Sequence, residues 1–293
     1  MNGANYVKRL VDNIKRIDYE NFEVVLVDDG STDGTADLFE RLIKGEPKLR
    51  EKILIIRNKE NVGTFHSRLI GVKHSQGSFV FFHDIDDLVY SKGVKKLLDD
   101  LLNFPNKKTL LTVTNALMSG EQFNGEIWCS NFYKNKEELF VSEITSLSGK
   151  FSIIDTLIER IPLQKAYEEL AEVLHKVGII KMTIAEDTIL ADYLLLEHFV
   201  EKMIPTFYTF RGYEVGNLQS SSKKLLERIK QIPIQISFLM VMSQKEKLFD
   251  KATLNQLENT VKQSAARIYG QELGQKFFEN YLEFKRRFSS ILL

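Results

Sequence analysis

The stretch Val27-Asp28-Asp29-Gly30-Ser31-Thr32-Asp33-Gly34-Thr35 decides the fold of this sequence. It ends the apolar run at residues 22–27, so two carboxylates stand where a buried strand would end. Two glycines then lead into a segment whose apolar residues recur at helical spacing. The pattern predicts a strand over residues 22–27, a tight turn, and a helix that Thr35 caps.

The same alternation of strand and helix extends to both sides of that stretch. An amphipathic helix is predicted over residues 6–17, strands over 53–56 and 78–82, and a helix over 65–72. Buried strands that alternate with amphipathic helices form a mostly parallel sheet, and such sheets bind ligands at the carboxyl ends of their strands. We therefore predict an α/β fold with a ligand site at these strand ends.

The rest of the chain departs from this alternation. A strand is predicted over residues 110–114, irregular or β structure over 128–140, and helices over 163–177 and 188–199. From Ser222 onward, apolar residues recur at helical spacing. We predict two parts: an α/β domain over residues 1–221 and a helical C-terminal extension over residues 222–293.

The composition excludes several classes of protein. The chain carries 40 Lys and Arg against 40 Asp and Glu, so no net charge draws it to nucleic acid. Its single cysteine, Cys129, excludes an internal disulfide and a multi-cysteine zinc site and is typical of a reducing compartment. The longest apolar stretch, residues 232–242, contains Pro233 and is too short to span a bilayer. We expect a cytoplasmic protein.

The carboxylates Asp28 and Asp29 allow two interpretations. A carboxylate at a strand end can accept hydrogen bonds from the imide of a uracil ring or from a ribose hydroxyl, and so recognise a nucleoside. Asp and Gly are equally the residues that form turns. Residues 28–35 alone leave both interpretations open.

A second acidic cluster follows the strand predicted over residues 78–82. Asp84, Asp86 and Asp87 lie close together in sequence, and such carboxylates repel one another unless a cation lies among them or water screens them. Hard oxygen ligands suit Mg²⁺ or Mn²⁺, which would hold the phosphates of a nucleotide. The alternative is a solvated acidic loop that caps the next helix.

Together these segments resemble family 2 of the glycosyltransferases, which are inverting enzymes of the GT-A fold. The matching segments, in chain order, are Asn2-Gly3-Ala4-Asn5-Tyr6, Val27 to Thr35, Glu60-Asn61-Val62-Gly63 through Arg68, Asp84-Ile85-Asp86-Asp87, Ala185-Glu186-Asp187-Thr188 and Phe207-Tyr208-Thr209-Phe210-Arg211. Their shared order is more specific than any single motif. The resemblance covers about residues 2–222 and implies a GT-A-like sheet flanked by helices.

The resemblance also implies a role for each candidate site residue. It implies nucleotide-sugar binding for Asp28, Asp29, Arg68, Asp84 and Arg211, metal binding for Asp86 and Asp84, and a general base at Asp187 with Glu186 as the next candidate. A base suits the chemistry because an acceptor hydroxyl is a poor nucleophile until a carboxylate takes its proton, and one displacement then inverts the anomeric centre. Alternatively, Glu186 and Asp187 are only the acids of a first helical turn, and the arginines pair with Asp84 or Asp86.

The implied activity is transfer of a sugar from a nucleotide diphosphate donor, with a UDP-sugar favoured, to a glycan or lipid-linked acceptor. Mn²⁺ or Mg²⁺ is the implied cofactor, and bacterial surface polysaccharide or glycoconjugate synthesis is the family's usual setting. One alternative is a catalytically silent GT-A-like subunit that partners another glycosyltransferase. Another is a nucleotidyltransferase, which is disfavoured because no glycine-rich basic phosphate loop lies near the N-terminus.

One segment departs from the family pattern. Family members have a strand ahead of the Asn2-Gly3 segment, and here Met1 stands where that strand would end. We expect an open slot or a substitute strand between the strands over 22–27 and 78–82. An open slot would expose two strand edges and favour association of copies into a homo-oligomer.

The end of the chain combines aromatic and basic residues. Phe277, Tyr281, Phe284 and Phe288 recur at helical spacing among lysines and arginines. Such a helix could lie peripherally on the inner face of a membrane that bears a lipid-linked acceptor. Packing on the catalytic domain is favoured, because an aromatic stripe at helical spacing is usually core.

Overall fold

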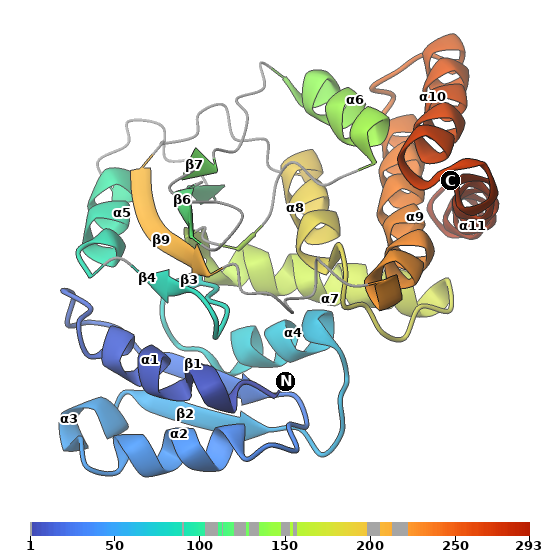
Figure 1. Ribbon diagram of the computed structural model, residues 1–293. Coiled ribbons are helices and arrows are strands. Elements are labelled where there is room, and N and C mark those ends of the chain that lie inside the picture. The colour runs from blue at the N-terminus through green and yellow to red at the C-terminus, as the bar shows by residue number, and fades with distance from the viewer. Residues whose placement is uncertain are drawn as a thin grey trace. The chain divides into compact units, whose positions relative to one another are not determined.

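The computed structural model describes residues 2–89, 91–102, 111–112, 114–119, 127–128, 135–147, 153–154, 157–197, 206–212 and 222–293 (Figure 1). The chain forms two compact units, and each is described by itself. The first contains residues 1–130, 153–165 and 202–215, and the second contains residues 131–152, 166–201 and 216–293. This division differs from the predicted boundary at residue 221, because residues 131–152 and 166–201 group with the C-terminal helices.

The first unit begins with the predicted alternation of helices and strands. Its first elements are α1 (Ala4–Ile14), β1 (Val24–Asp28), α2 (Thr35–Ile43), α3 (Pro47–Arg50), β2 (Ile53–Arg57) and α4 (Thr64–His74). β1 and β2 pair in parallel, with Val24 opposite Ile53. α1 and α2 pack on one face of this pair (Figure 1), where Val7, Phe39 and Ile53 share one buried cluster.

Thr35 does not cap α2 as the sequence predicted. Thr35 is the first residue of the helix, and Gly34 precedes it in the left-handed conformation with φ 80°. The backbone N–H of Thr35 donates to Oδ1 of Asp33 at 3.1 Å. The glycine at position 34 therefore makes the turn, and Asp33 accepts the hydrogen bond expected of a capping residue.

The remaining strands of the first unit form two further sheets. One has the order β3 (Phe79–Phe81), β8 (Leu157–Glu159), β5 (Leu111–Thr112), and the other β4 (Leu88–Val89), β9 (Thr206–Gly212), β6 (Thr114–Ser119), β7 (Ile127–Trp128), with α5 (Gly93–Leu102) beside β9. Of the described pairings between strands, β1–β2 and β6–β9 are parallel and the others are antiparallel, and Phe82 and Ile154 form one isolated parallel bridge. The α/β class is confirmed, and parallel pairing is limited to these two pairs of strands.

Strands β1 and β3 belong to different sheets. Among the described residues β1 pairs only with β2, and β3 pairs only with β8. All residues of both strands are partly exposed, although most are apolar. In the described residues, β1 and β3 are therefore not paired directly with each other, and whether a slot or a substitute strand lies between them stays a prediction.

The second unit is helical. It contains α6 (Lys136–Ser146), most of α7 (Arg160–Lys176), α8 (Glu186–Glu197), α9 (Ser222–Lys245), α10 (Lys251–Tyr269) and α11 (Gln271–Leu292). Irregular or β structure was expected over residues 128–140. The helix α6 corrects that expectation at residues 136–140, Trp128 lies in β7, and residues 129–134 lie outside the described residues. No helix in the described part of the chain is long and apolar enough to cross a membrane.

The aromatic stripe of α11 forms part of the core of this second unit. Phe277, Tyr281 and Phe288 are fully buried, and Phe238 of α9 contacts Phe288 edge to face with ring centroids 5.5 Å apart. Phe284 remains partly exposed. Three of the four aromatic residues are therefore core, as expected of such a stripe, but the contact shown is with α9 and not with the α/β domain on which packing was predicted.

Candidate active site

The first acidic strand end lies at the carboxyl end of β1. The Asp28 carboxylate accepts a hydrogen bond from the backbone N–H of Ser31 at 3.1 Å, which closes the turn after the strand. Gly30 has φ 70°, and a Cβ there would lie 3.0 Å from the backbone N of Asn61. Glycine is therefore required at position 30 for the turn to approach the loop before α4.

Asp29 holds that loop in place. Its Oδ1 accepts from Asn58 Nδ2 at 3.0 Å and from the backbone N–H of Val62 at 2.8 Å, and its Oδ2 accepts from the N–H of Gly63 at 3.0 Å. The residue is only 8% exposed. The structure thus gives Asp29 a positioning role at the loop before α4.

These hydrogen bonds keep Asp29 ionised. Burial acts to raise the pKa of Asp29, but hydrogen bonds from Asn58, Val62, Ser67 and Gly63 outweigh it and hold the pKa below its ordinary value. A carboxylate that accepts several N–H groups is favoured in its charged form. The carboxyl end of β1 therefore carries a fixed negative charge.

The second acidic strand end follows β3. Asp84 lies half-exposed, and Nη2 of Arg68 on α4 donates to its Oδ1 at 3.1 Å. The backbone N–H of Asp87 donates to the Asp84 carbonyl at 3.0 Å, and Asp87 is buried. Since α4 begins directly after the loop that Asp29 holds, α4 connects the two acidic strand ends.

The donor set of this loop fits a divalent cation with few protein ligands. Within the described residues, no group of three or more His, Cys, Asp or Glu is arranged to hold a metal ion. Mg²⁺ and related ions are commonly held by one or two carboxylates together with water and substrate phosphates. The partly exposed carboxylates of Asp84 and Asp86 suit that mode of binding.

The candidate base lies in the second unit, at the start of α8. Glu186 is buried and Asp187 is partly exposed, so Asp187 is the one that an acceptor could reach. Ala185 precedes them with φ 60°, a left-handed conformation that costs about 1 kcal/mol or more for a residue with a side chain. Its carbonyl accepts from Thr188 Oγ1 at 3.0 Å and from the N–H of Ile189 at 2.9 Å.

A glutamine on α9 fixes the segment that leads into α8. Oε1 of Gln231 accepts from the backbone N–H groups of Thr183 at 2.9 Å and Ile184 at 3.0 Å. Its Nε2 donates to Glu227 at 3.0 Å. No local sequence pattern indicates this contact, because Gln231 lies 48 residues from Thr183.

A buried polar cluster lies farther along α8. Nε2 of Gln235 donates to Oδ2 of Asp192 at 3.0 Å and to Oε2 of Glu143 at 3.1 Å, and all three residues are fully buried. Burial raises the pKa of Asp192 to about 6, against the hydrogen bonds from Glu143 and Gln235, and the charge of Asp187 raises it further. No local sequence pattern indicates this cluster either, because Glu143 and Asp192 lie 92 and 43 residues from Gln235.

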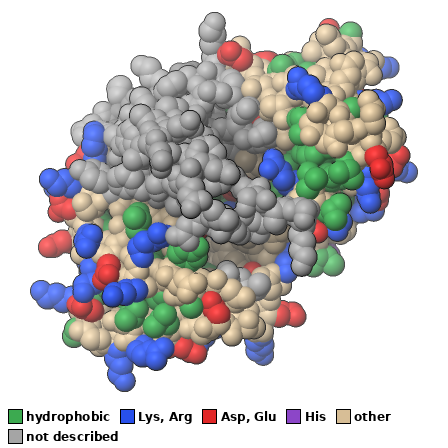
Figure 2. Space-filling model, in the orientation of Figure 1, with side chains coloured by type: hydrophobic (Ala, Val, Ile, Leu, Met, Phe, Trp, Pro, Cys, Tyr) green, Lys and Arg blue, Asp and Glu red, His purple; other side chains and the backbone are tan. Residues whose placement is uncertain are grey.

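The structure brings some candidate residues together and leaves others apart. Asp28, Asp29, Arg68, Asp84 and Asp86 all lie in the first unit, whereas Glu186 and Asp187 are described within the second. Arg211 lies in β9 with its backbone opposite Met118, and its side chain is outside the described part of the chain. On the face in Figure 2, basic and acidic side chains lie among one another over the described surface, in keeping with the balanced charge.

Comparison with known proteins agrees with these motifs. The sequence profile described as "Glycosyl transferase family 2" matches residues 1–154. An uncharacterized glycosyltransferase of Haemophilus influenzae is 28% identical over 134 residues, which are 43% of this chain and 40% of that protein. The putative teichuronic acid biosynthesis glycosyltransferase TuaG of Bacillus subtilis is 29% identical over 101 residues, 34% of this chain and 38% of that protein. The chain thus spans less than half the length of both relatives.

Solved structures share the fold. S. aureus TarS 1–349 in complex with UDP-GlcNAc has a TM-score of 0.54 at 15% identity, over 99% of this chain and 89% of that one. The mannosyltransferase PcManGT of Pyrobaculum calidifontis, in complex with GDP-Man and Mn²⁺, has a TM-score of 0.50 at 16% identity, over 98% and 82% of the two chains. At such low identity this likeness shows a GT-A-type fold and nothing about substrates.

Proposed function

This chain belongs to glycosyl transferase family 2, and we propose that it transfers a sugar from a nucleotide diphosphate donor to a hydroxyl of a glycan or lipid-linked acceptor, with inversion. A UDP-sugar is the proposed donor. UDP-GlcNAc is bound by TarS and GDP-Man by PcManGT, so structures of this fold do hold nucleotide sugars.

The observation that carries the proposal is the link between the two acidic strand ends. Asp29 fixes the loop before α4 through its hydrogen bonds with Val62 and Gly63, and α4 then places Arg68 on Asp84. A nucleoside at the first strand end and phosphates at the second would therefore contact one connected structure. Asp28 and Asp29 would receive the base, and Arg68 would offset diphosphate charge together with Arg211.

A divalent cation would be held by Asp86 and Asp84. When bound, Mn²⁺ or Mg²⁺ stabilises the charge that develops on a leaving diphosphate. The Arg68–Asp84 ion pair keeps the Asp84 carboxylate oriented before any ligand arrives. PcManGT with GDP-Man and Mn²⁺ is a precedent for such a metal on this fold.

Asp187 is the proposed general base. It is partly exposed at the first turn of α8, where an acceptor hydroxyl could approach it. An ionised carboxylate can take the proton of the acceptor hydroxyl as the new glycosidic bond forms. Glu186 is buried and is the second candidate.

The proposed setting is the synthesis of a bacterial surface polysaccharide. TuaG is named for teichuronic acid biosynthesis, which supports a glycan acceptor. We place the reaction in the cytoplasm, with contact to the membrane through a lipid-linked acceptor and an assembly of more than one copy as further parts of the proposal.

A donor panel tests this function. UDP- and GDP-sugars are incubated with the chain and Mn²⁺, and release of the nucleoside diphosphate is measured, alongside Asp86→Asn and the exposed control Glu51→Gln. We expect Asp86→Asn to abolish Mn²⁺-dependent nucleotide binding and release, because a carboxylate ligand is lost, and Glu51→Gln to match the parent. Tight Mn²⁺-dependent binding of UDP by Asp86→Asn would refute the metal assignment.

A catalytically silent GT-A-like subunit is the second candidate function, because β1 and β3 do not pair with each other in the described residues. It predicts that the chain binds a partner glycosyltransferase yet releases no diphosphate from any donor. The same donor panel therefore decides between the two functions.

A further inference from the structure

The segment ahead of α1 binds the turn that follows β1. The backbone N–H of Asn2 donates to Ser31 Oγ at 2.9 Å, and Asn2 Oδ1 accepts from the N–H of Thr32 at 2.9 Å. The N–H of Gly3 donates to Thr35 Oγ1 at 2.9 Å. The start of α1 is thereby fixed to the candidate nucleoside turn.

The body of α1 binds the acidic loop. A Cβ at Gly3 would lie 2.8 Å from Cδ1 of Ile85, so the helix start is in close contact with this loop. One turn and a half further on, Nη2 of Arg9 donates to the backbone carbonyl of Asp86 at 2.5 Å. Arg9 therefore holds the backbone of the proposed metal ligand through its carbonyl.

Asn13 extends this contact to the strand after the loop. Its Oδ1 accepts from the backbone N–H of Val89 and its Nδ2 donates to the carbonyl of Val89, both at 2.8 Å. Val89 lies opposite Thr209 of β9 in the sheet. The amide of Asn13 thus satisfies both backbone groups of a buried strand residue, as a neighbouring strand would.

We propose that Arg9 and Asn13 are positioning residues that set the backbone of residues 85–89 relative to the nucleoside turn, so that bound nucleotide and bound cation reinforce each other. The proposal rests on the proposed function, because it takes Asp86 as a metal ligand. It follows from a single rigid helix that contacts both strand ends, which are separated by about fifty residues of sequence.

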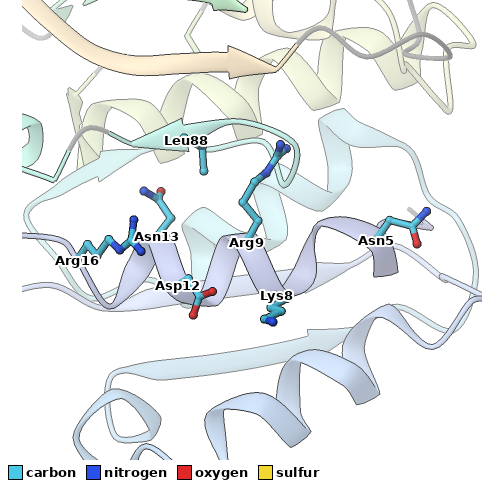
Figure 3. Close-up of a pocket in the computed structure, with 7 residues that line it drawn as sticks. All are labelled: Asn5, Lys8, Arg9, Asp12, Asn13, Arg16 and Leu88. Carbon is cyan, nitrogen blue, oxygen red and sulfur yellow. The ribbon is translucent and has the colours of Figure 1, made fainter. Parts of the chain in front are cut away.

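Because Arg9 is charged, a positioning role for it can be distinguished from a purely electrostatic effect on cation binding. Arg9, Lys8 and Arg16 line one groove of about 410 Å³ beside Leu88, and Arg9 and Asn13 reach from α1 toward the loop (Figure 3). Loss of a positive charge beside a metal site would tighten cation binding. Loss of a positioning contact would weaken it. The two explanations predict changes of opposite sign for Arg9→Met, and Asn13→Leu changes no charge at all.

Titration calorimetry tests the proposal through the affinity for UDP with and without Mn²⁺. We expect Asn13→Leu and Arg9→Met each to reduce the gain in UDP affinity from Mn²⁺ by roughly tenfold, in line with the loss of one or two buried hydrogen bonds. Arg9→Lys, which keeps a donor, should recover part of the gain. Lys8→Met and Arg16→Met, which remove charge from the same groove, should leave the gain as in the parent.

Hydrogen exchange of the amides in residues 84–89 gives a readout that needs no ligand. We expect faster exchange at Val89 in Asn13→Leu, with α4 and β1 protected as in the parent, which also shows that the variant is folded. If Val89 exchanged faster in Asn13→Leu but Mn²⁺ still raised the UDP affinity as much as in the parent, the positioning role would be overturned and the proposed function would stand. If Mn²⁺ did not raise the UDP affinity of the parent at all, the metal-dependent function itself would be refuted.

Discussion

The guanidinium of Arg68 lies 3.1 Å from the carboxylate of Asp84, which joins α4 to the loop after β3. Arg68 is only 12% exposed, whereas Asp84 is 46% exposed, so a mostly buried cation directs a carboxylate that water can reach. A pair of this kind has two uses at a diphosphate site. The arginine offsets phosphate charge, and the aspartate is held in one orientation for a metal ion.

The ion pair predicts that Arg68→Met changes the affinities for Mn²⁺ alone and for UDP with Mn²⁺ in different ways. Mn²⁺ alone should bind the variant as well as or better than the parent, because a repelling charge is lost. UDP in the presence of Mn²⁺ should bind roughly tenfold more weakly, because the diphosphate loses a cationic partner. Titration calorimetry measures both, with the exposed Lys44→Met as control. Parallel weakening of both ligands would mean that Arg68 acts by orienting Asp84 and not by offsetting phosphate charge.

Asp187→Asn should separate rate from binding. Its turnover should fall roughly a hundredfold or more with donor affinity nearly unchanged, because a general base acts on the acceptor in the transition state. Steady-state transfer assays and donor titrations provide the two numbers. Glu186→Gln is the matched variant at the neighbouring position. If Glu186→Gln lost turnover while Asp187→Asn kept it, the base would be Glu186.

The buried pair Asp192 and Glu143 predicts how stability depends on pH. Burial raises the pKa of Asp192 to about 6 in the folded chain, above the value near 3.9 that an unfolded chain would have. The folded state therefore binds the proton more tightly, and this contribution to stability is complete below about pH 4 and is lost as the pH rises through 6. The melting temperature should fall by several degrees between pH 5 and pH 7.5.

Asp192→Asn is the variant that isolates this effect. An amide does not titrate, so the fall in melting temperature between pH 5 and 7.5 should become smaller, with scanning calorimetry as the measurement. Glu172→Gln, at a surface acid on α7 whose pKa is lowered by Lys176, is the control and should keep the fall. If the melting temperature of Asp192→Asn fell with pH as steeply as that of the parent, other groups would set the pH dependence of stability.

The sequence predicted the elements that have strong local patterns. The strand ends at Asp28 and Asp84 and the helix that begins near Glu186 follow from apolar periodicity and turn residues, which act over a few neighbours. Sequence could not predict the contacts of Gln231 and Gln235, because they join helices separated by more than forty residues. Arg9 and Asn13 read as polar residues on an amphipathic helix, and only tertiary packing brings them to residues 86–89.

Asp29→Asn tests the positioning role that the structure adds to the predicted binding role. Asp29 accepts from both Val62 and Gly63, so an amide NH₂ in place of one oxygen would face a backbone N–H and lose a charge-assisted hydrogen bond. We expect the free energy of unfolding at pH 7 to fall by about 2 kcal/mol. Urea denaturation gives this number, with Asp37→Asn on the exposed face of α2 as control.

The pH dependence of that loss identifies its cause. The pKa of Asp29 is lowered in the folded state, where burial is outweighed by its hydrogen bonds, so the stabilisation is present above the unfolded pKa near 3.9 and disappears as the pH falls through the folded value. The difference between parent and Asp29→Asn should therefore shrink below pH 4. A difference that stays constant from pH 7 to pH 3 would show that the carboxylate charge is not what holds the loop. Weaker uridine binding without any loss of stability would make Asp29 a ligand-binding residue only.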